Sequence, residues 1–431
     1  MAVFTLVRAA CFGVALTASL GVSAQSKEIN IGVIFDLTGA FAAGGSKAAA
    51  IGTEIAIDMI NERGGVEGYK INYQMADAQS KTDVAINETE RFLNESKVDM
   101  IMGVFSSSQC VPMAAKVDSA QKFMWANVCV SSAVFKNKNL KYVFRAQVHS
   151  DQLGEASCMF LAENAQAKLG MDVKEVKVAI IHEDGPYGSG VASGNKAKCE
   201  SLGMKVVHEE GYAATSTDLS ALVTKLRRAR PDVILHTGYN PDITLFLRQS
   251  KESGLRWKAL IGHGAGYGQI DKLKSTFGED ANYIYNVDPV AAQLLDPATL
   301  ADGLGDVTAE MVSRYKAQTQ ASEVPPHVSM GFNQSWIFFT DVMPRAITKY
   351  GGIDPESLRK AALDTDIPVG GTIQGYGVKF NPPGDVMAGQ NARSSPVVMQ
   401  YVEEGTKIAW PTPLKTIDAV LPLPKGHAYA R

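Results

Sequence analysis

Residues 28–45 read EINIGVIFDLTGAFAAGG, and this stretch decides the fold class. Its first part, Glu28 to Phe35, is a largely apolar run rich in isoleucine and valine, which is typical of a strand buried on both faces. A loop follows from Asp36 to Gly45, and apolar residues then recur at helical spacing from Ala48 to Glu62. A buried strand, a loop and a helix in this order predict the start of a parallel α/β unit.

The alternation of strand and helix is repeated in two separate runs. The first run continues with strands expected at residues 69–75, 99–105 and 123–128. The second run has strands expected at residues 177–181, 205–208, 232–236 and 258–261, and helical patterns separate the strands in both. The pattern therefore predicts an α/β protein with two doubly wound parallel-sheet lobes, as the length of 431 residues also favours.

The N-terminal residues have the features of a secretory signal. Arg8 is the only charged side chain before an apolar run from Ala9 to Leu20, and the small residues Val22-Ser23-Ala24 follow. We predict a signal peptide over residues 1–24 and an exported, periplasmic protein. The apolar run is short for a bilayer span, and a signal anchor is the alternative.

Composition argues against several classes of function. The net charge of −3 comes without a basic stretch, so nothing indicates a nucleic-acid partner. No second hydrophobic run suggests a membrane span. No His/Cys cluster has metal-ligand spacing, and the glycine-rich residues 262–268 lack a dinucleotide fingerprint. We expect no metal and no other cofactor.

Four cysteines follow the signal region, and an exported protein can oxidise them. Cys110 and Cys129 fall in successive strand–helix units, and Cys158 and Cys199 fall in successive helices. We expect these two local pairs to form disulfides, with reduced, buried thiols as the alternative.

In open parallel sheets, ligands bind beyond the carboxyl ends of the strands. The loops expected there carry hydroxyls, glycines and aromatic residues; they are residues 36–39, 106–108, 130–132, 183–188, 238–240 and 262–267. Ser107 and Ser108 precede a helix, whose free N–H groups and dipole favour an anion such as a carboxylate. The alternative is that one of these serines caps the helix, and capping is compatible with binding an anion.

Taken together, these motifs resemble the periplasmic branched-chain amino-acid-binding proteins of ABC importers, which have the type I solute-binding fold. The resemblance covers nearly all of the mature chain and rests on the order of IGVIFDLTGAFAAGG, AIDMINERGGVEGYKI, GVFSSSQCVP, AIIHEDGPYGSG, HTGYNPD and PHVSMGF. It implies two lobes that close over a ligand and are joined by a three-strand hinge. On this basis we predict a first lobe of residues 27–147 and 287–372, and a second of residues 148–286 and 373–431. The hinge crossings are expected near Val148, Val287 and Thr372.

The resemblance also implies which residues contact the ligand. By position, Ser107 and Ser131 hold the ligand's carboxylate, together with Ser108 and the backbone near Cys129 and Val130. The second-lobe residues expected to close over the ligand are Tyr187, Tyr239, Asn240, His263 and Gly264.

Two positions depart from the family's pattern. The glutamate that holds the ammonium in amino-acid-binding members falls at Gly264, and an aromatic residue of the first loop falls at Gly44. An ammonium buried without a carboxylate is strongly unfavourable, so the ligand is expected to lack an amino group, as in an aromatic or other organic acid. The alternative is that Asp288 or Glu183 supplies the missing negative charge, in which case the ligand is an amino acid. His263 is expected to hydrogen-bond a ligand carbonyl or hydroxyl, or to be an exposed loop histidine.

The leading hypothesis is a non-enzymatic, monomeric binding protein that captures a small carboxylate and delivers it to the membrane permease of an ABC importer. A ligand sensor for a membrane receptor is the first alternative, although no signalling domain follows in the sequence. An α/β enzyme is the second, and neither a G-x-S-x-G elbow nor a paired-carboxylate motif supports it.

Overall fold

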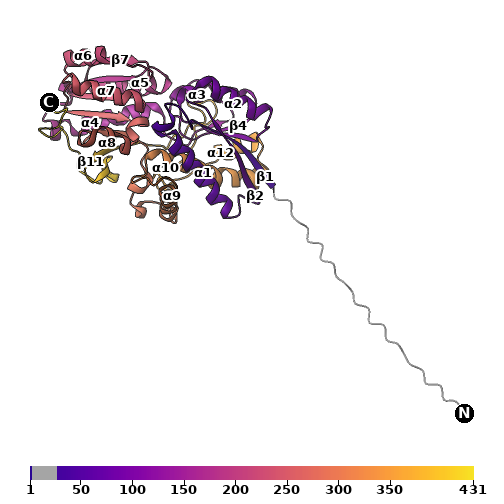
Figure 1. Ribbon diagram of the computed structural model, residues 1–431. Helices are drawn as coiled ribbons and strands as arrows, with labels where there is room; N and C mark the ends of the chain where they lie inside the picture. Colours follow the sequence, from indigo (N-terminus) through magenta and orange to yellow (C-terminus); the bar gives the residue numbers. More distant parts are fainter. Residues whose placement is uncertain (2–26) are drawn as a thin grey trace.

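The computed structural model describes Met1 and residues 27–431, which form two α/β lobes side by side (Figure 1). The predicted signal peptide lies outside the described residues, apart from Met1. Within the part of the chain that is described, no helix has the length and apolar character needed to cross a membrane.

The first lobe is built on a parallel five-stranded sheet with the order β2-β1-β3-β4-β5. Its strands are β1 (Lys27–Phe35), β2 (Tyr69–Asp77), β3 (Met100–Gly103), β4 (Phe123–Ala126) and β5 (Val143–Phe144). Its helices are α1 (Lys47–Glu62), α2 (Thr82–Asn94) and α3 (Ser107–Ser119). Alternate residues of β1 face opposite layers: Val33 packs in the core that contains α1, and Ile34 packs with Phe92 of α2. The apolar run from Glu28 to Phe35 therefore forms a strand covered on both faces, as predicted.

The second lobe holds a seven-stranded sheet with the order β12-β11-β10-β9-β8-β6-β7. Five strands are parallel: β6 (Lys177–Glu183), β7 (Lys205–Tyr212), β8 (Val233–Thr237), β9 (Ala259–His263) and β10 (Tyr285–Asp288). An antiparallel hairpin of β11 (Val397–Val402) and β12 (Gly405–Trp410) forms the far edge. The helices of this lobe are α4 (Ser150–Asn164), α5 (Pro186–Ser201), α6 (Ser220–Ala229), α7 (Asn240–Glu252) and α8 (Ile270–Phe277).

After β10 the chain returns to the first lobe through four helices. They are α9 (Leu304–Thr319), α10 (Pro326–Ile337), α11 (Met343–Tyr350) and α12 (Pro355–Leu363). Helix α10 lies directly against α1 (Figure 1). A side chain at Gly52 would collide with the Val328 carbonyl, and one at Gly331 with the Ala49 carbonyl. Glycine at both positions therefore permits this close approach, which brings the start of α10 to the space between the lobes.

The third crossing between the lobes differs from the expected position near Thr372. The Arg145 N–H donates to the Gly389 carbonyl, and the Asn391 N–H donates to the Arg145 carbonyl, so residues 389–391 lie beside β5 of the first sheet. The chain therefore passes to the second lobe between Asn391 and β11. Residues 389–391 pair with the edge of the first sheet, and the irregular sequence of this segment did not indicate that pairing. We keep the first two crossings, near Val148 and Val287, as a proposal.

Both expected cysteine pairs are disulfides. Cys110 in α3 is bonded to Cys129 after β4, and Cys158 in α4 is bonded to Cys199 in α5. Each bond joins neighbouring elements within one lobe, so the disulfides leave the two lobes free to move relative to each other.

We expect the free energy of unfolding of the Cys158→Ala/Cys199→Ala variant to be about 2–4 kcal/mol lower than that of the wild type. The reason is that the bond closes a loop of 41 residues in the unfolded chain. Urea unfolding of the variant and of the wild-type protein, both oxidised so that the Cys110–Cys129 bond is intact, measures the loss. Equal midpoints for the variant and the oxidised wild type would show that this bond contributes nothing to stability.

Candidate ligand-binding site

A cavity of about 330 Å³, a volume that includes the part open to solvent, lies between the lobes. The first lobe contributes Phe105, Ser107, Val128, Val130, His327 and Met330. The second contributes Leu153, Tyr187, Tyr239, Gly264, Ala265 and Asp288. Most of these residues follow the carboxyl ends of β3, β4, β6, β8 and β9, where open parallel sheets bind ligands. The cavity is mostly apolar with a few polar groups, as binding sites for small molecules are.

Two buried serines lie next to each other on the polar side of the first lobe: Ser107 lines the cavity, and Ser131 lies beside it, outside the cavity wall. Ser107 is the first residue of α3 and lines the cavity, and its Oγ accepts a hydrogen bond from the Ser131 N–H at 3.1 Å. The Ser131 Oγ accepts from the Ala133 N–H at 3.2 Å. Both hydroxyl groups act as acceptors in these contacts, so each keeps its own proton to donate. Hydroxyls that donate beside the N-terminus of α3 suit a carboxylate.

Ser108 and Cys129 do not line the cavity. The Ser108 Oγ lies 2.8 Å from the Ser106 Oγ and 3.5 Å from the Thr82 Oγ1, on the side of α2. Cys129 is held in its disulfide, and its carbonyl accepts a hydrogen bond from Arg145. Of the residues around Cys129, Val130 forms part of the cavity wall.

Arg145 donates hydrogen bonds to the main chain of residues 129–131, which carry Ser131 and which we call the serine loop. This arginine was not identified from the sequence. Its Nη1 donates to the carbonyls of Cys129 at 2.8 Å and Ser131 at 3.0 Å, and its Nε donates to Gln390 at 2.7 Å. The side chain is completely buried, which lowers its pKa to about 9. The guanidinium therefore stays charged at neutral pH behind the proposed carboxylate site. A lone arginine within the apolar stretch YVFRAQV was the signal that could have revealed it.

Two tyrosines of the second lobe form the opposite wall. Tyr187 and Tyr239 have ring centroids 5.5 Å apart, and the Tyr187 hydroxyl donates to the His263 carbonyl at 2.5 Å. Phe41 of the first lobe lies against Tyr239, with ring centroids 4.3 Å apart. This contact shows that the lobes meet over the cavity. Asn240 begins α7 and is not part of the cavity wall.

His263 does not point to the cavity, which corrects the expectation of a ligand contact. It is fully buried in β9. Its Nε2 lies 2.9 Å from the Ser157 Oγ, and its Nδ1 lies 2.9 Å from the Thr237 Oγ1. Burial lowers its pKa to about 4, so the ring is neutral. Both ring nitrogens are engaged with protein groups, because the residue is the last of its strand rather than the first of the loop.

We therefore expect His263→Leu to reduce stability by about 2–3 kcal/mol, since it removes the partner of the buried Thr237 hydroxyl and one of the partners of the Ser157 hydroxyl. The affinity of the folded protein for its ligand should change less than about threefold. Urea unfolding and calorimetric titration measure the two effects separately. Lost affinity with normal stability would mean that His263 touches the ligand after all.

The two candidate acids differ in their surroundings. Glu183 accepts hydrogen bonds from the N–H groups of Gly185 at 2.7 Å and Gly188 at 2.5 Å, so it caps the start of α5 and does not line the cavity. Asp288 lines the cavity from the end of β10. Its Oδ2 accepts one long hydrogen bond, 3.4 Å, from Asn286, and its Oδ1 has no partner within residues 27–431. Burial raises the pKa of Asp288 to about 8.

Comparison with known proteins identifies the family. Residues 28–387 match the family described as "Periplasmic binding protein". The chain belongs to this family. A relative at 30% identity over 403 residues is the Leu/Ile/Val-binding protein homolog 7 of Brucella abortus (strain 2308), and the match covers 93% of this chain and 96% of the relative.

Solved structures with the same fold agree with this membership. The branched-chain amino acid transporter substrate binding protein LivJ from Streptococcus pneumoniae, in complex with isoleucine, has a TM-score of 0.70 at 19% identity, and the match covers 89% of this chain and 100% of LivJ. A fatty acid ABC transporter substrate-binding protein from Thermomonospora curvata has a TM-score of 0.73 at 18% identity and covers 91% and 95%. The family and these neighbours are solute-binding proteins rather than enzymes, as the sequence predicted.

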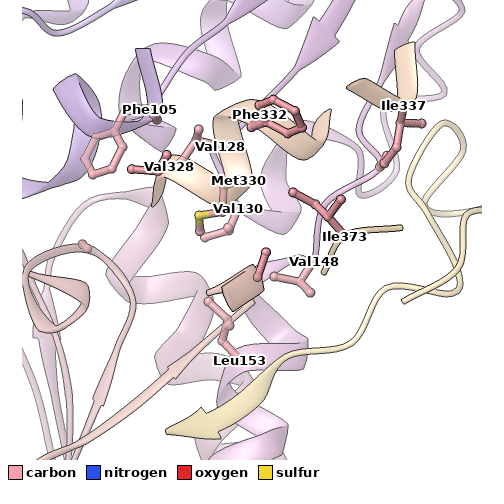
Figure 2. Packing of buried hydrophobic residues seen from close by; sticks show 14 of the residues in the cluster. Phe105, Val128, Val130, Val148, Leu153, Val328, Met330, Phe332, Ile337 and Ile373 are labelled. Carbon is pink, nitrogen blue, oxygen red and sulfur yellow. The ribbon is translucent and has the colours of Figure 1, made fainter. Parts of the chain in front are cut away.

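Val130 was predicted, whereas three other apolar walls of this periplasmic binding protein's cavity, Val128, Met330 and Leu153, were not. Val128, Val130, Met330 and Leu153 come from three separate segments and lie around one space (Figure 2). Val128 ends a predicted strand and could have been inferred. Met330 belongs to α10, as His327 does, and nothing in the sequence of that helix shows that its first turns reach the space between the lobes.

His327 adds a neutral polar group to the cavity. It is buried, its Nδ1 lies 3.0 Å from the Gln269 Nε2, and burial lowers its pKa to about 4. A neutral imidazole offers a ligand a hydrogen bond without a charge. Among the described residues, no group of three or more His, Cys, Asp or Glu is placed to hold a metal ion.

Proposed function

We propose that this periplasmic binding protein captures a small solute with a carboxylate group between its lobes and delivers it to the membrane permease of an ABC importer. The observation that carries the proposal is the position of Ser107. Its buried hydroxyl faces the cavity at the first turn of α3, next to Ser131, and the main-chain N–H groups there have no partner within the helix.

The comparisons support the same ligand chemistry. The curated relative is named for leucine, isoleucine and valine, and the structural neighbours are named for isoleucine and fatty acids. All of these solutes carry a carboxylate, although they differ in the amino group and the hydrocarbon part. A site of hydroxyls, a helix N-terminus and apolar walls fits what they share.

Closure of the lobes explains how a binding protein of this kind signals that it is loaded. The cavity takes its wall from both lobes, and Phe41 meets Tyr239 across it. A ligand that bridges both halves stabilises the closed arrangement relative to the open one, because only the closed arrangement offers all the contacts. We propose that the monomer, exported by its signal peptide, presents this closed form to the permease.

A thermal-shift screen tests the proposal. The panel contains L-amino acids, their counterparts without the amino group, and their amides, in which the carboxylate is replaced by a neutral group. At 100 times its dissociation constant, a ligand adds roughly 2.7 kcal/mol to the stability of the folded state. We expect at least one carboxylate to raise the melting temperature and its amide to leave it unchanged. A panel in which no carboxylate acts, or in which an amide acts equally, would contradict the proposal.

A further inference from the structure

The carboxylate of Asp288 in the cavity is almost without hydrogen-bond partners in the described part of the protein. Asp288 is completely buried, lines the cavity, and leaves its Oδ1 without a partner within residues 27–431. Burying a carboxylate in this way is unfavourable unless something pairs with it. Its Oδ2 receives only the 3.4 Å contact from Asn286, which lies on the same strand. The missing partner is therefore expected to come from the ligand.

The backbone conformation of Gly264 disfavours a side chain at this position. Gly264 has φ +42° and ψ −146°, a conformation that side chains other than glycine rarely adopt. A Cβ atom there would lie 3.2 Å from the Asp288 Oδ1 and 3.2 Å from the Tyr187 hydroxyl. The carboxylate of Asp288 therefore borders the space that a side chain at Gly264 would enter. Asp288 belongs to β10, whereas Gly264 lies in the loop after β9.

We propose that Asp288 determines specificity by pairing with a cationic amino group of the ligand, so that the site selects solutes carrying both a carboxylate and an amine. This inference rests on the proposed function and replaces the expectation of a ligand without an amino group. Glu183, the other acid considered, is engaged at the start of α5.

The charges around the cavity favour such a ligand. No lysine or arginine is among the described residues that line the cavity. The serine loop is contacted by the buried Arg145, and the hydroxyl of the next residue, Ser132, donates a hydrogen bond to Asp151 at 2.6 Å. The ammonium of an amino acid would pair with ionised Asp288, which has no other cation beside it among the described residues that line the cavity. An acid without an amino group offers Asp288 no cation, and its carboxylate would repel Asp288 whenever that side chain is ionised.

Calorimetric titration with matched ligand pairs tests the proposal. The members of each pair differ only in the amino group: L-leucine with 4-methylpentanoate, L-phenylalanine with 3-phenylpropanoate, and the remaining apolar amino acids with their counterparts. We expect wild-type protein to prefer the amino acid of the best-bound pair by about 100-fold, and Asp288→Asn to abolish that preference.

Glu183→Gln is the matched control, because it neutralises the other buried acid near the site. We expect it to lower stability while the preference within each pair is unchanged. The ratio of the two affinities is the informative quantity, since a general loss of structure lowers both affinities together. Thermal unfolding without ligand verifies that Asp288→Asn is folded, and the uncharged amide is expected to be tolerated at this buried position.

The pH dependence provides a second readout. An ammonium pairs with ionised Asp288, whereas the empty cavity holds the proton, so amino-acid affinity should rise from pH 5 to pH 8, by up to about tenfold per unit. The titratable groups facing Asp288 are Tyr187 of α5, Tyr401 of β11 and His327 of α10; burial raises the pKa of both tyrosines well above 10 and lowers that of His327 to about 4. In Asp288→Asn this rise should disappear.

The outcomes separate the inference from the proposed function. A wild-type preference for the member without the amino group, or a preference that Asp288→Asn leaves intact, overturns the role of Asp288 and keeps the carboxylate-binding function. A panel in which no member of any pair binds overturns both. Tighter amino-acid binding at pH 5 than at pH 8 also overturns the inference, because it would show that the protonated acid is the form that binds.

Discussion

Replacing Ser107 and Ser131 together with alanine is expected to weaken ligand binding by about 100-fold to 10,000-fold while both lobes stay folded. A hydrogen bond to a charged group contributes about 1.5–3 kcal/mol, and the two hydroxyls are expected to donate one each to the carboxylate. The variant also loses the acceptors for the N–H groups of Ser131 and Ala133. That loss should lower stability by only about 1–2 kcal/mol.

Ser108→Ala is the matched control for this experiment. Ser108 is the next residue of the same helix, but its hydroxyl lies beside Ser106 and outside the cavity. Calorimetric titration with the best ligand of the screen should show a change of less than about threefold for Ser108→Ala. Full affinity in the double variant, or an equally large loss in Ser108→Ala, would place the carboxylate site elsewhere.

Arg145→Met is expected to cost about 3–5 kcal/mol of stability, the largest loss of any single substitution considered for this protein. The carbonyl of Cys129 and the side chain of Gln390 lose their Arg145 donor, and the carbonyl of Ser131 keeps only the 3.4 Å contact from the Val134 N–H. Because the loop that carries Ser131 then loses its support, ligand affinity should fall together with stability.

Urea unfolding with and without ligand measures both effects. Arg314→Met is the control, because the ion pairs of Arg314 with Glu62 and Glu310 lie at the surface, where such pairs contribute at most about 1 kcal/mol. Equal losses in the two variants would show that Arg145 is not the support of the serine loop.

Much of the fold follows from local sequence. The apolar runs at β1, β6, β8 and β9 are covered on both faces by helices, so their composition alone identifies them as central strands. Ser107 could be placed because a strand, a serine and a helix in succession put that serine at the carboxyl edge of the sheet. The disulfides could be paired because each joins adjacent elements.

The remaining features depend on contacts between distant segments. Residues 389–391 lie beside β5 through main-chain hydrogen bonds, which any sequence can make, so the third crossing was misplaced. Whether a loop residue faces the cavity depends on a shift of one position, as His263 and Gly264 show. Glu183 and Asp288 look equivalent in the sequence, and the structure distinguishes them: Glu183 accepts hydrogen bonds from Gly185 and Gly188, whereas Asp288 lines the cavity.

The most direct test of the account is a crystal structure of the protein grown with the ligand that the screen selects. The account predicts a ligand carboxylate at about 2.7–3.2 Å from the hydroxyls of Ser107 and Ser131, and an amino nitrogen at a similar distance from the Asp288 Oδ1. A ligand bound outside the space between the lobes, or one whose nearest atoms to Asp288 are apolar or acidic, would contradict it.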